Sequence, residues 1–283
     1  MDISREHEKK ISILVPLYNY YDGILRIVKF LDEEDLSEVE VIVLDDSDNP
    51  DEQLRIQKLL INYKHFIKYR HNHVSLGPVI NWNALLDMAS ADYIILMHHD
   101  EFLLSKKFIK NAIDRIENIK FDVGIFNCFL MRGSNIYKQH LSISLRYLFY
   151  KFLPIYIFKR NFIGPTASLI VKRSLCERFD SNLRWLVDVD WYYRLAIKTR
   201  NIVFFKDIAV CSEIDANNSI TRKIKFDLPH ILKSEEIYLS KKYNKSFLFF
   251  LTGSSLFCKA FCIVESLAWK TLSIFCLIFQ RMN

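Results

Sequence analysis

Short apolar runs alternate with amphipathic segments through the first 116 residues of the chain. The apolar runs have the length of buried strands, and the segments between them place apolar residues at helical spacing. We expect strands or extended segments at Ile11–Leu17, Val39–Leu44, His65–Arg70 and Tyr93–Met97, and helices at Asp22–Leu31, Asp51–Ile61, Pro78–Ala89 and Ser105–Ile116. Alternating strands and helices predict a mostly parallel, Rossmann-like α/β sheet with helices on both faces.

The pattern loosens after Gly124, where the sequence predicts a strand at Ala167–Lys172, a helix at Asp188–Lys198 and a closing strand at Ile202–Phe205. Near Ser246 the composition shifts to Phe, Leu, Cys and Ile. A length of 283 residues fits one large domain or two small ones. We therefore expect an α/β domain over 1–225 and a C-terminal segment of apolar helices over 226–283.

Composition excludes several classes of function. The net charge of +6 suits an anionic partner, but the basic residues are scattered, so we expect no nucleic-acid partner. The sequence contains neither a GxGxxG nor a GxxxxGK[ST] motif to hold phosphates. Six cysteines without a CxxC pair predict reduced thiols rather than structural zinc. The polar N-terminus, MDISREHEKK, is unlike a signal peptide, so we expect a cytoplasmic protein.

Polar side chains follow three of the predicted strands. Tyr18 and Asn19 follow the first strand, Asp45 and Asp46 end the second, and the run from His98 to Glu101 follows the fourth. The carboxyl ends of parallel strands form the ligand-binding edge of such sheets. Because crowded carboxylates repel one another, a divalent cation with oxygen ligands is the simplest occupant.

Four motifs occur in a fixed order along the chain: ILVPLYN at 13–19, VLDDS at 43–47, GPVINWNA at 77–84 and DYIILMHHDE at 92–101. Together they resemble glycosyltransferase family 2, whose members are inverting, nucleotide-sugar-dependent enzymes with the GT-A fold. The bacterial surface-polysaccharide members are the most similar. The resemblance covers about Ile11 to Thr221.

The resemblance implies roles for individual residues. Asp100 and Glu101 fall in the metal-binding region, which implies a divalent cation, Mn²⁺ or Mg²⁺. Donor-binding positions would be Pro16, Tyr18, Asn19, Asp45, Asp46, Asn81, His99 and Thr166.

The chain departs from the family where relatives read His-Asp-Asp-Asp, because His99 replaces the first Asp and Glu101 the last. His99 would then contact ribose or phosphate and leave Asp100 or Glu101 to bind the metal. Weakened metal dependence, or an inactive homologue, are the alternatives. Relatives also carry a late His that holds the diphosphate, and this chain has none between Ser212 and Thr221.

The general base is expected near the start of the helix at Asp188–Lys198. Relatives carry an acidic pair here, followed six residues later by Arg, and counting back from Arg194 selects Asp188. Asp190 is the competing candidate. Asp188 would also serve as a helix N-cap, which is the structural alternative to catalysis.

Two stretches indicate a membrane surface. Leu141 to Phe162 interleaves aromatic and basic residues, and Phe247 to Phe279 is apolar but interrupted by Lys259, Glu265 and Lys270. Such charges disfavour a spanning helix and favour helices that lie on or dip into the cytoplasmic leaflet. A buried C-terminal helix pair is the alternative.

The sequence thus predicts an inverting glycosyltransferase, of the hexosyltransferase type, located peripherally on the inner face of the plasma membrane. The partners would be a nucleotide-sugar donor, a glycan or polyprenyl-diphosphate-linked acceptor and an anionic membrane surface. A non-catalytic membrane scaffold with the same fold and a nucleotidyltransferase are the alternatives. The latter needs a Gly-rich basic loop where this chain has Val-Pro-Leu-Tyr-Asn.

Overall fold

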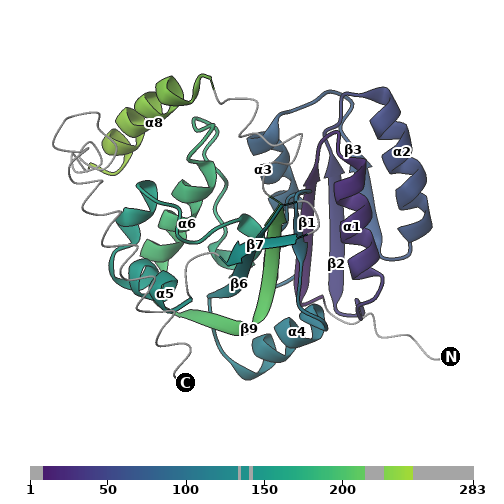
Figure 1. Ribbon diagram of the computed structural model, residues 1–283, viewed down its shortest axis with the longest axis horizontal. Coiled ribbons are helices and arrows are strands. Elements are labelled where there is room, and N and C mark those ends of the chain that lie inside the picture. The colour runs from purple at the N-terminus through teal and green to yellow at the C-terminus, as the bar shows by residue number, and fades with distance from the viewer. Residues whose placement is uncertain (1–8, 133–134, 140–142, 214–225, 245–283) are drawn as a thin grey trace.

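The computed structural model describes residues 9–132, 135–139, 143–213 and 226–244 (Figure 1). Its sheet has the strand order β3-β2-β1-β4-β8-β6-β9-β5, with β7 paired to β6. The first four strands in this order are parallel to one another, as predicted. They are β3 (Ile67–His71), β2 (Val39–Asp45), β1 (Ile11–Leu17) and β4 (Tyr93–Leu96).

Helices cover both faces of this sheet, as the sequence predicts. Successive residues of β1 point to opposite faces, so Ile13 and Val15 join one apolar core and Leu14 joins the other. The first core also contains residues of α1 (Tyr21–Leu31), α2 (Pro50–Leu60) and α4 (Phe108–Asn118). The second contains residues of α3 (Pro78–Met88), α5 (Ile143–Phe152) and α6 (Val187–Lys198).

Antiparallel pairing enters in the second half of the sheet. β8 (Leu169–Lys172) runs antiparallel to both β4 and β6 (Val123–Arg132). β9 (Ile202–Glu213) is parallel to β6, and β5 (Glu101–Leu103) and β7 (Asn135–Gln139) are antiparallel edge partners of β9 and β6. The alternation at the start of the chain predicts only the parallel half.

The strand predicted at Ile202–Phe205 is longer than expected, since β9 continues to Glu213. Lys206 and Asp207 interrupt its apolar pattern, which is why the prediction ends before them. In the structure the pairing partner changes from Phe126↔Phe205 to Asn127↔Ala209, so the intervening residues of β9 have no partner on β6. The polar pair therefore marks a bulge rather than the end of the strand.

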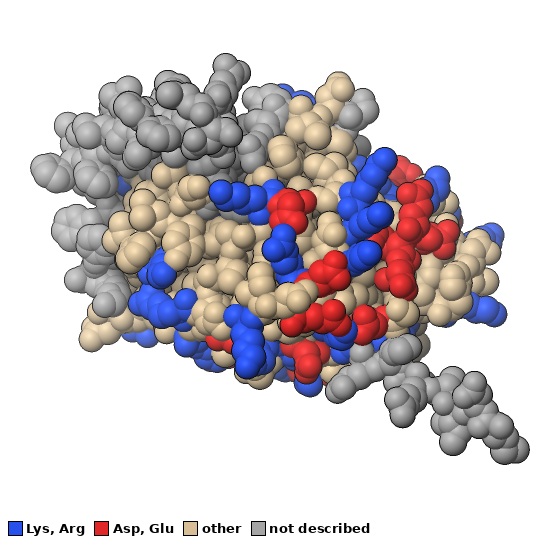
Figure 2. Space-filling view, turned by 90° about the horizontal axis from the view of Figure 1, so that it is seen from below, with Lys and Arg blue, Asp and Glu red and all other residues tan. Residues whose placement is uncertain are grey.

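The aromatic and basic stretch from Leu141 to Phe162 forms α5 and the short helix η2 (Pro154–Phe158). Part of it is core, since Tyr150 and Phe162 are fully buried. Leu148, Phe152 and Leu153 are 51–63% exposed. Figure 2 shows one face of the molecule, on which acidic side chains are concentrated over the right half of the view and the left half carries scattered basic ones.

Helix α8 (Leu228–Lys242) follows β9 in the described chain and packs beside the α6 region (Figure 1). No helix within the described ranges is long and apolar enough to cross a bilayer. The apolar helices predicted over Phe247–Phe279 lie outside the described residues.

A buried carboxylate ties the parallel strands together at their amino ends. Glu40 on β2 is 2% exposed and accepts hydrogen bonds from the Ser12 hydroxyl on β1 and from the backbone N–H of Ser90 and Ala91 before β4. Lys68 on β3 pairs with its other oxygen. Burial alone would raise the pKa of Glu40, but the hydrogen bonds from Ser12, Lys68 and Ser90 outweigh it and lower the pKa to about 2.

Replacing Glu40 by Gln is expected to lower the free energy of unfolding by about 1–3 kcal/mol at pH 7, because a buried donor loses its acceptor. The ionised Glu40 carboxylate stabilises the folded state at pH values above its unfolded-state pKa of 4.5. This contribution is lost as the pH falls toward the folded-state pKa of about 2. Urea unfolding of both proteins at pH 7 and pH 3 checks this. An equal difference at the two pH values would contradict it.

Candidate active site

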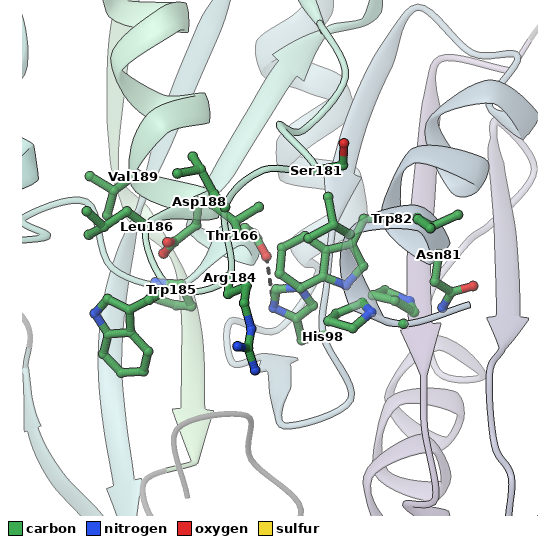
Figure 3. A pocket seen from close by; sticks show the side chains of 18 of the residues that line it. Asn81, Trp82, His98, Thr166, Ser181, Arg184, Trp185, Leu186, Asp188 and Val189 are labelled. Atoms are coloured by element: carbon green, nitrogen blue, oxygen red, sulfur yellow. Dashed lines mark hydrogen bonds between the residues drawn. The ribbon is translucent and has the colours of Figure 1, made fainter. Parts of the chain in front are cut away.

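A cleft of about 1240 Å³ opens at the carboxyl ends of the parallel strands. One side is formed by the ends of β1 and β2 and the loop that leads into α3. The other side is formed by η3 (Thr166–Ser168) and by the segment that leads into α6, with a contribution from α8. Figure 3 shows labelled side chains from both sides pointing toward the space between them. The strand-end position is the one predicted for a ligand site.

Asp46 shapes the first side of the cleft. Its carboxylate is 3% exposed and accepts hydrogen bonds from the Ser75 hydroxyl and from the backbone N–H of Leu76 and Gly77, at 2.8–2.9 Å. Gly77 has a φ of +81°, a conformation that side chains disfavour. Asp46 therefore holds the loop that leads into α3. It also accepts a hydrogen bond from the Asn72 amide, which donates a second one to Asn81 on that helix.

Glu101 connects the end of β4 to the second side. One oxygen accepts from the backbone N–H of His98 and Ala167 and from the Thr166 hydroxyl, and the other lies 3.1 Å from Nδ1 of His98. Burial pushes the pKa of Glu101 up, but the His98 imidazole and the backbone N–H groups outweigh it and leave the pKa lowered. Glu101 is thus an ionised carboxylate fixed between two loops.

Asp100 is in a different situation. Its carboxylate lines the cleft and receives no hydrogen bond from another side chain within the described residues. Burial and the adjacent Glu101 charge raise its pKa. An ionised Asp100 therefore needs a positive partner that enters the cleft from outside.

Ligand atoms of His98, Asp100 and Glu101 lie within 4.8 Å of one another. His98 also has a buried Nε2 atom that finds no hydrogen-bond partner among the residues that the structure describes. Two carboxylates and an imidazole form a donor set that suits a divalent cation such as Mn²⁺. These residues fit the predicted metal, with Asp100 as its open ligand. The sequence predicted His99 as the substituted position, whereas the structure brings His98 into the cluster.

Asp188 lies in the first turn of α6 and lines the other side of the cleft. It accepts a hydrogen bond of 3.1 Å from the Asn161 amide, which is itself held by the loop at Gly164. Burial raises the pKa of Asp188 to about 6. A carboxylate with such a pKa in a cleft can accept a proton near neutral pH.

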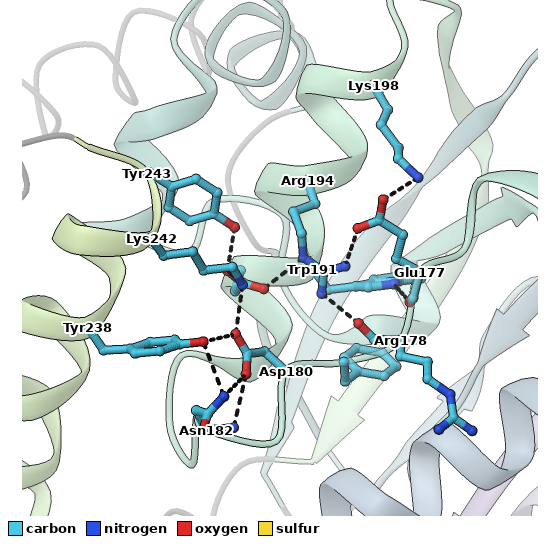
Figure 4. A network of polar contacts seen from close by, with 12 residues as sticks. Glu177, Arg178, Asp180, Asn182, Trp191, Arg194, Lys198, Tyr238, Lys242 and Tyr243 are labelled. Carbon is cyan, nitrogen blue, oxygen red and sulfur yellow. Dashed lines mark hydrogen bonds and ion pairs between the residues drawn. The ribbon is translucent and has the colours of Figure 1, made fainter.

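Asp190 does not line the cleft. It is fully buried and accepts hydrogen bonds from Arg194 Nε at 2.8 Å, Lys242 Nζ at 2.9 Å and Tyr243 Oη at 2.6 Å. Figure 4 shows these partners within a polar network that extends to Asp180 and Glu177. The arginine used to count the register therefore pairs with Asp190, four residues earlier on the same helix. The bonds from Lys242 and Tyr243 to Asp190 connect α6 to the end of α8.

The remaining predicted residues divide into two groups. Asn19 and Asp45 do not line the cleft. Asn19 forms hydrogen bonds with Asp48 and Ser47, and Asp45 accepts hydrogen bonds from Ser47 and Tyr69. The predicted residues that line the cleft, apart from those already described, are Pro16, Tyr18, Asn81, His99 and Thr166.

Several residues that line the cleft were not predicted as site residues, among them Trp82, His98 and Arg184. Trp82 packs its ring 4.6 Å from that of His98, although its position on a helix favoured a core residue. His98 was not selected because the family pattern points to the next residue, His99. Arg184 extends into the cleft from the segment before α6 (Figure 3). It lies just before the acidic motif at Asp188 and is not part of it.

The two acidic residues of α6 are expected to respond oppositely to substitution. Asp190→Ala should cost about 1–3 kcal/mol of stability, because it removes the acceptor of the hydrogen bonds from Arg194, Lys242 and Tyr243. Asp188→Asn should leave the stability unchanged or raised at pH 7, because it removes a charge that burial disfavours. Chemical denaturation measures both. A stable Asp190→Ala protein with an unstable Asp188→Asn protein would reverse the assignment.

Comparison with known proteins places this cleft in a family. A model of glycosyl transferase family 2 matches residues 12–179, more than half of the chain. Two curated relatives are each 25% identical to it. One is a GalNAc(5)-diNAcBac-PP-undecaprenol beta-1,3-glucosyltransferase of Campylobacter jejuni, matched over 46% of this chain and 41% of the relative. The other is the putative colanic acid biosynthesis glycosyl transferase WcaA of Escherichia coli K12, matched over 66% of each.

Solved structures of S. aureus TarS share the fold. The complex of TarS with UDP-GlcNAc aligns with a TM-score of 0.59 at 19% identity, over 75% of this chain and 60% of that one. The complex with UDP aligns with a TM-score of 0.58 at 19% identity, over 87% and 76%. The predicted GT-A fold is thus confirmed, and the matches span between about two fifths and three quarters of these proteins' lengths. The chain belongs to glycosyl transferase family 2.

Proposed function

We propose that this protein transfers a sugar, with inversion, from a nucleoside-diphosphate donor to an acceptor in surface-polysaccharide assembly. The observation that carries the proposal is that one cleft holds both the carboxylate of Asp100, after β4, and the partly buried carboxylate of Asp188 at the start of α6, whose pKa is raised to about 6. The two sit on different elements that border the same space, as a leaving-group site and a base require.

The donor is proposed to be a UDP-sugar, bound with its nucleotide on the side of β1, β2 and α3. TarS, which shares the fold, was solved with UDP and with UDP-GlcNAc. Asp46 and the Ser75–Gly77 loop, together with Tyr18 and Asn81, offer polar groups on this side. The acceptor is proposed to be lipid-linked, since the name of one relative contains an undecaprenol-linked glycan.

In the proposed reaction Asp188 takes the proton from the acceptor hydroxyl. The acceptor oxygen forms a bond to the anomeric carbon from the face opposite the diphosphate, and the bond from that carbon to the diphosphate oxygen breaks with its electron pair. A divalent cation, when bound, would neutralise the charge on the leaving diphosphate. Asp100 would hold that cation. Glu101 would hold the residues after β4 against the loop that carries Thr166 and Ala167.

Asp100→Ala should weaken UDP binding in the presence of Mn²⁺ by at least about tenfold and leave binding without metal unchanged. Isothermal titration calorimetry with and without Mn²⁺ measures this. Asp114→Ala on the exposed face of α4 is the matched control and should bind like the wild type. An unchanged Mn²⁺ effect in Asp100→Ala would remove Asp100 from the metal site.

Asp188→Asn should cut the turnover number by about 10²–10⁴-fold and leave UDP binding near the wild-type value. The base acts only when deprotonated, and burial raises its pKa to about 6, so wild-type turnover should rise with pH through about 6 and level off above it. Product formation between pH 5 and 8 checks both statements. Full activity in Asp188→Asn would assign the base elsewhere.

We also propose that α5 contacts an anionic membrane surface. Phe152 and Leu153 are more than half exposed, with Lys151 beside them in sequence. Apolar side chains flanked by basic ones suit the interface between headgroups and acyl chains.

Phe152→Glu should reduce binding to vesicles that contain phosphatidylglycerol by several-fold, because it adds a negative charge to the contact. Sedimentation of protein with vesicles is the measurement. Leu54→Glu, at an equally apolar and 50% exposed site on α2, is the control and should bind normally. Equal binding by both variants would place the membrane contact outside α5.

A further inference from the structure

Helix α8 contributes directly to the cleft. Leu232 and Glu236, on its second and third turns, line the same space as Asp188. The helix belongs to the C-terminal segment over 226–283. Its contacts join it to the second side of the cleft.

The strongest of these contacts comes from Glu235, whose side chain is 3% exposed. Its two oxygens accept hydrogen bonds from three consecutive backbone N–H groups, those of Arg184 at 2.5 Å, Trp185 at 3.0 Å and Leu186 at 2.8 Å. These N–H groups immediately precede α6, and Leu186 at the N-cap makes no side-chain capping bond of its own. Glu235 therefore satisfies, from another helix, three backbone donors of the segment that leads into α6.

The segment that Glu235 holds carries much of the second side of the cleft. Arg184, Trp185 and Leu186 all line it, and Asp188 follows two residues later. A shift of these backbone groups would move the Asp188 carboxylate with them, because both lie on the start of the same helix. Displacing a reacting group by about 1 Å can cost two orders of magnitude in rate.

A second set of contacts fixes the other end of α8. Lys242 bonds to Asp180 and Asp190, Tyr238 bonds to Asp180, and Tyr243 bonds to Asp190 (Figure 4). These contacts dock the helix without touching the 184–186 backbone. They offer a control that separates docking of α8 from the position of the segment before α6.

We propose that Glu235 is a positioning residue for sugar transfer: through three backbone N–H groups it sets the place of Asp188, which makes α8 a part of the active site. The inference rests on the proposed function for its catalytic consequence. The donor side is built from other elements, so Glu235 should affect turnover and leave donor binding intact.

The test compares Glu235→Gln with Tyr238→Phe in the full-length protein. The amide of Gln presents an NH₂ group to at least one backbone donor, so turnover at saturating UDP-sugar should fall at least about tenfold, with the donor KM and the UDP affinity unchanged. Tyr238→Phe loses the hydrogen bond to Asp180. It should keep the wild-type turnover, even if its melting temperature falls as much as that of Glu235→Gln. Glu235→Asp keeps both oxygens on a shorter side chain and should be intermediate, and it carries the test if Glu235→Gln does not fold.

Hydrogen exchange gives a readout that does not need activity. The amides of residues 184–186 should exchange faster in Glu235→Gln and at the wild-type rate in Tyr238→Phe. Unchanged exchange at these amides, unchanged turnover in Glu235→Gln, or equal loss of turnover in both variants would overturn the inference. A wild-type protein that transfers no sugar would overturn the proposed function instead, and the exchange result would still decide whether Glu235 holds the segment.

Discussion

Buried carboxylates that accept backbone N–H groups determine the shape of the cleft. Asp46 holds the loop that begins α3, Glu101 holds the end of β4 against Ala167, and Glu235 holds the segment before α6. A loop that borders a cleft leaves backbone donors without strand or helix partners, and an unpaired buried donor is costly. One acidic side chain satisfies two or three such donors, so each carboxylate fixes a section of the cleft wall.

The acidic residues of the site therefore fall into two groups. Those whose oxygens are occupied by N–H donors are structural, whereas Asp100 and Asp188 face the cleft and have raised pKa values because of burial. Both carboxylates line the cleft, where they can interact with a cation or a proton. Perturbed carboxylates of this kind are typical of catalytic sites. Asp190, with three partners, belongs to the structural group.

The parallel half of the sheet and the cleft at its edge could be predicted, because local periodicity and strand order specify both. Asp188 could be selected by its distance from Arg194, although that arginine pairs with Asp190 in the structure. The role of His98 was missed because two adjacent histidines give no sign of which one turns inward. Glu235 was missed because it lies 49–51 residues from the amides that it binds, and a single acidic residue on a helix has no distinguishing pattern.

We propose that Asp188 and the diphosphate site act on opposite faces of the transferred sugar. The most direct measurement is the anomer first released when the protein hydrolyses an α-linked donor, UDP-glucose or UDP-N-acetylglucosamine, without acceptor. Rapid proton NMR can record it before the free sugar mutarotates. The account predicts the β anomer, because water attacks from the side of Asp188. Initial release of the α anomer would contradict it.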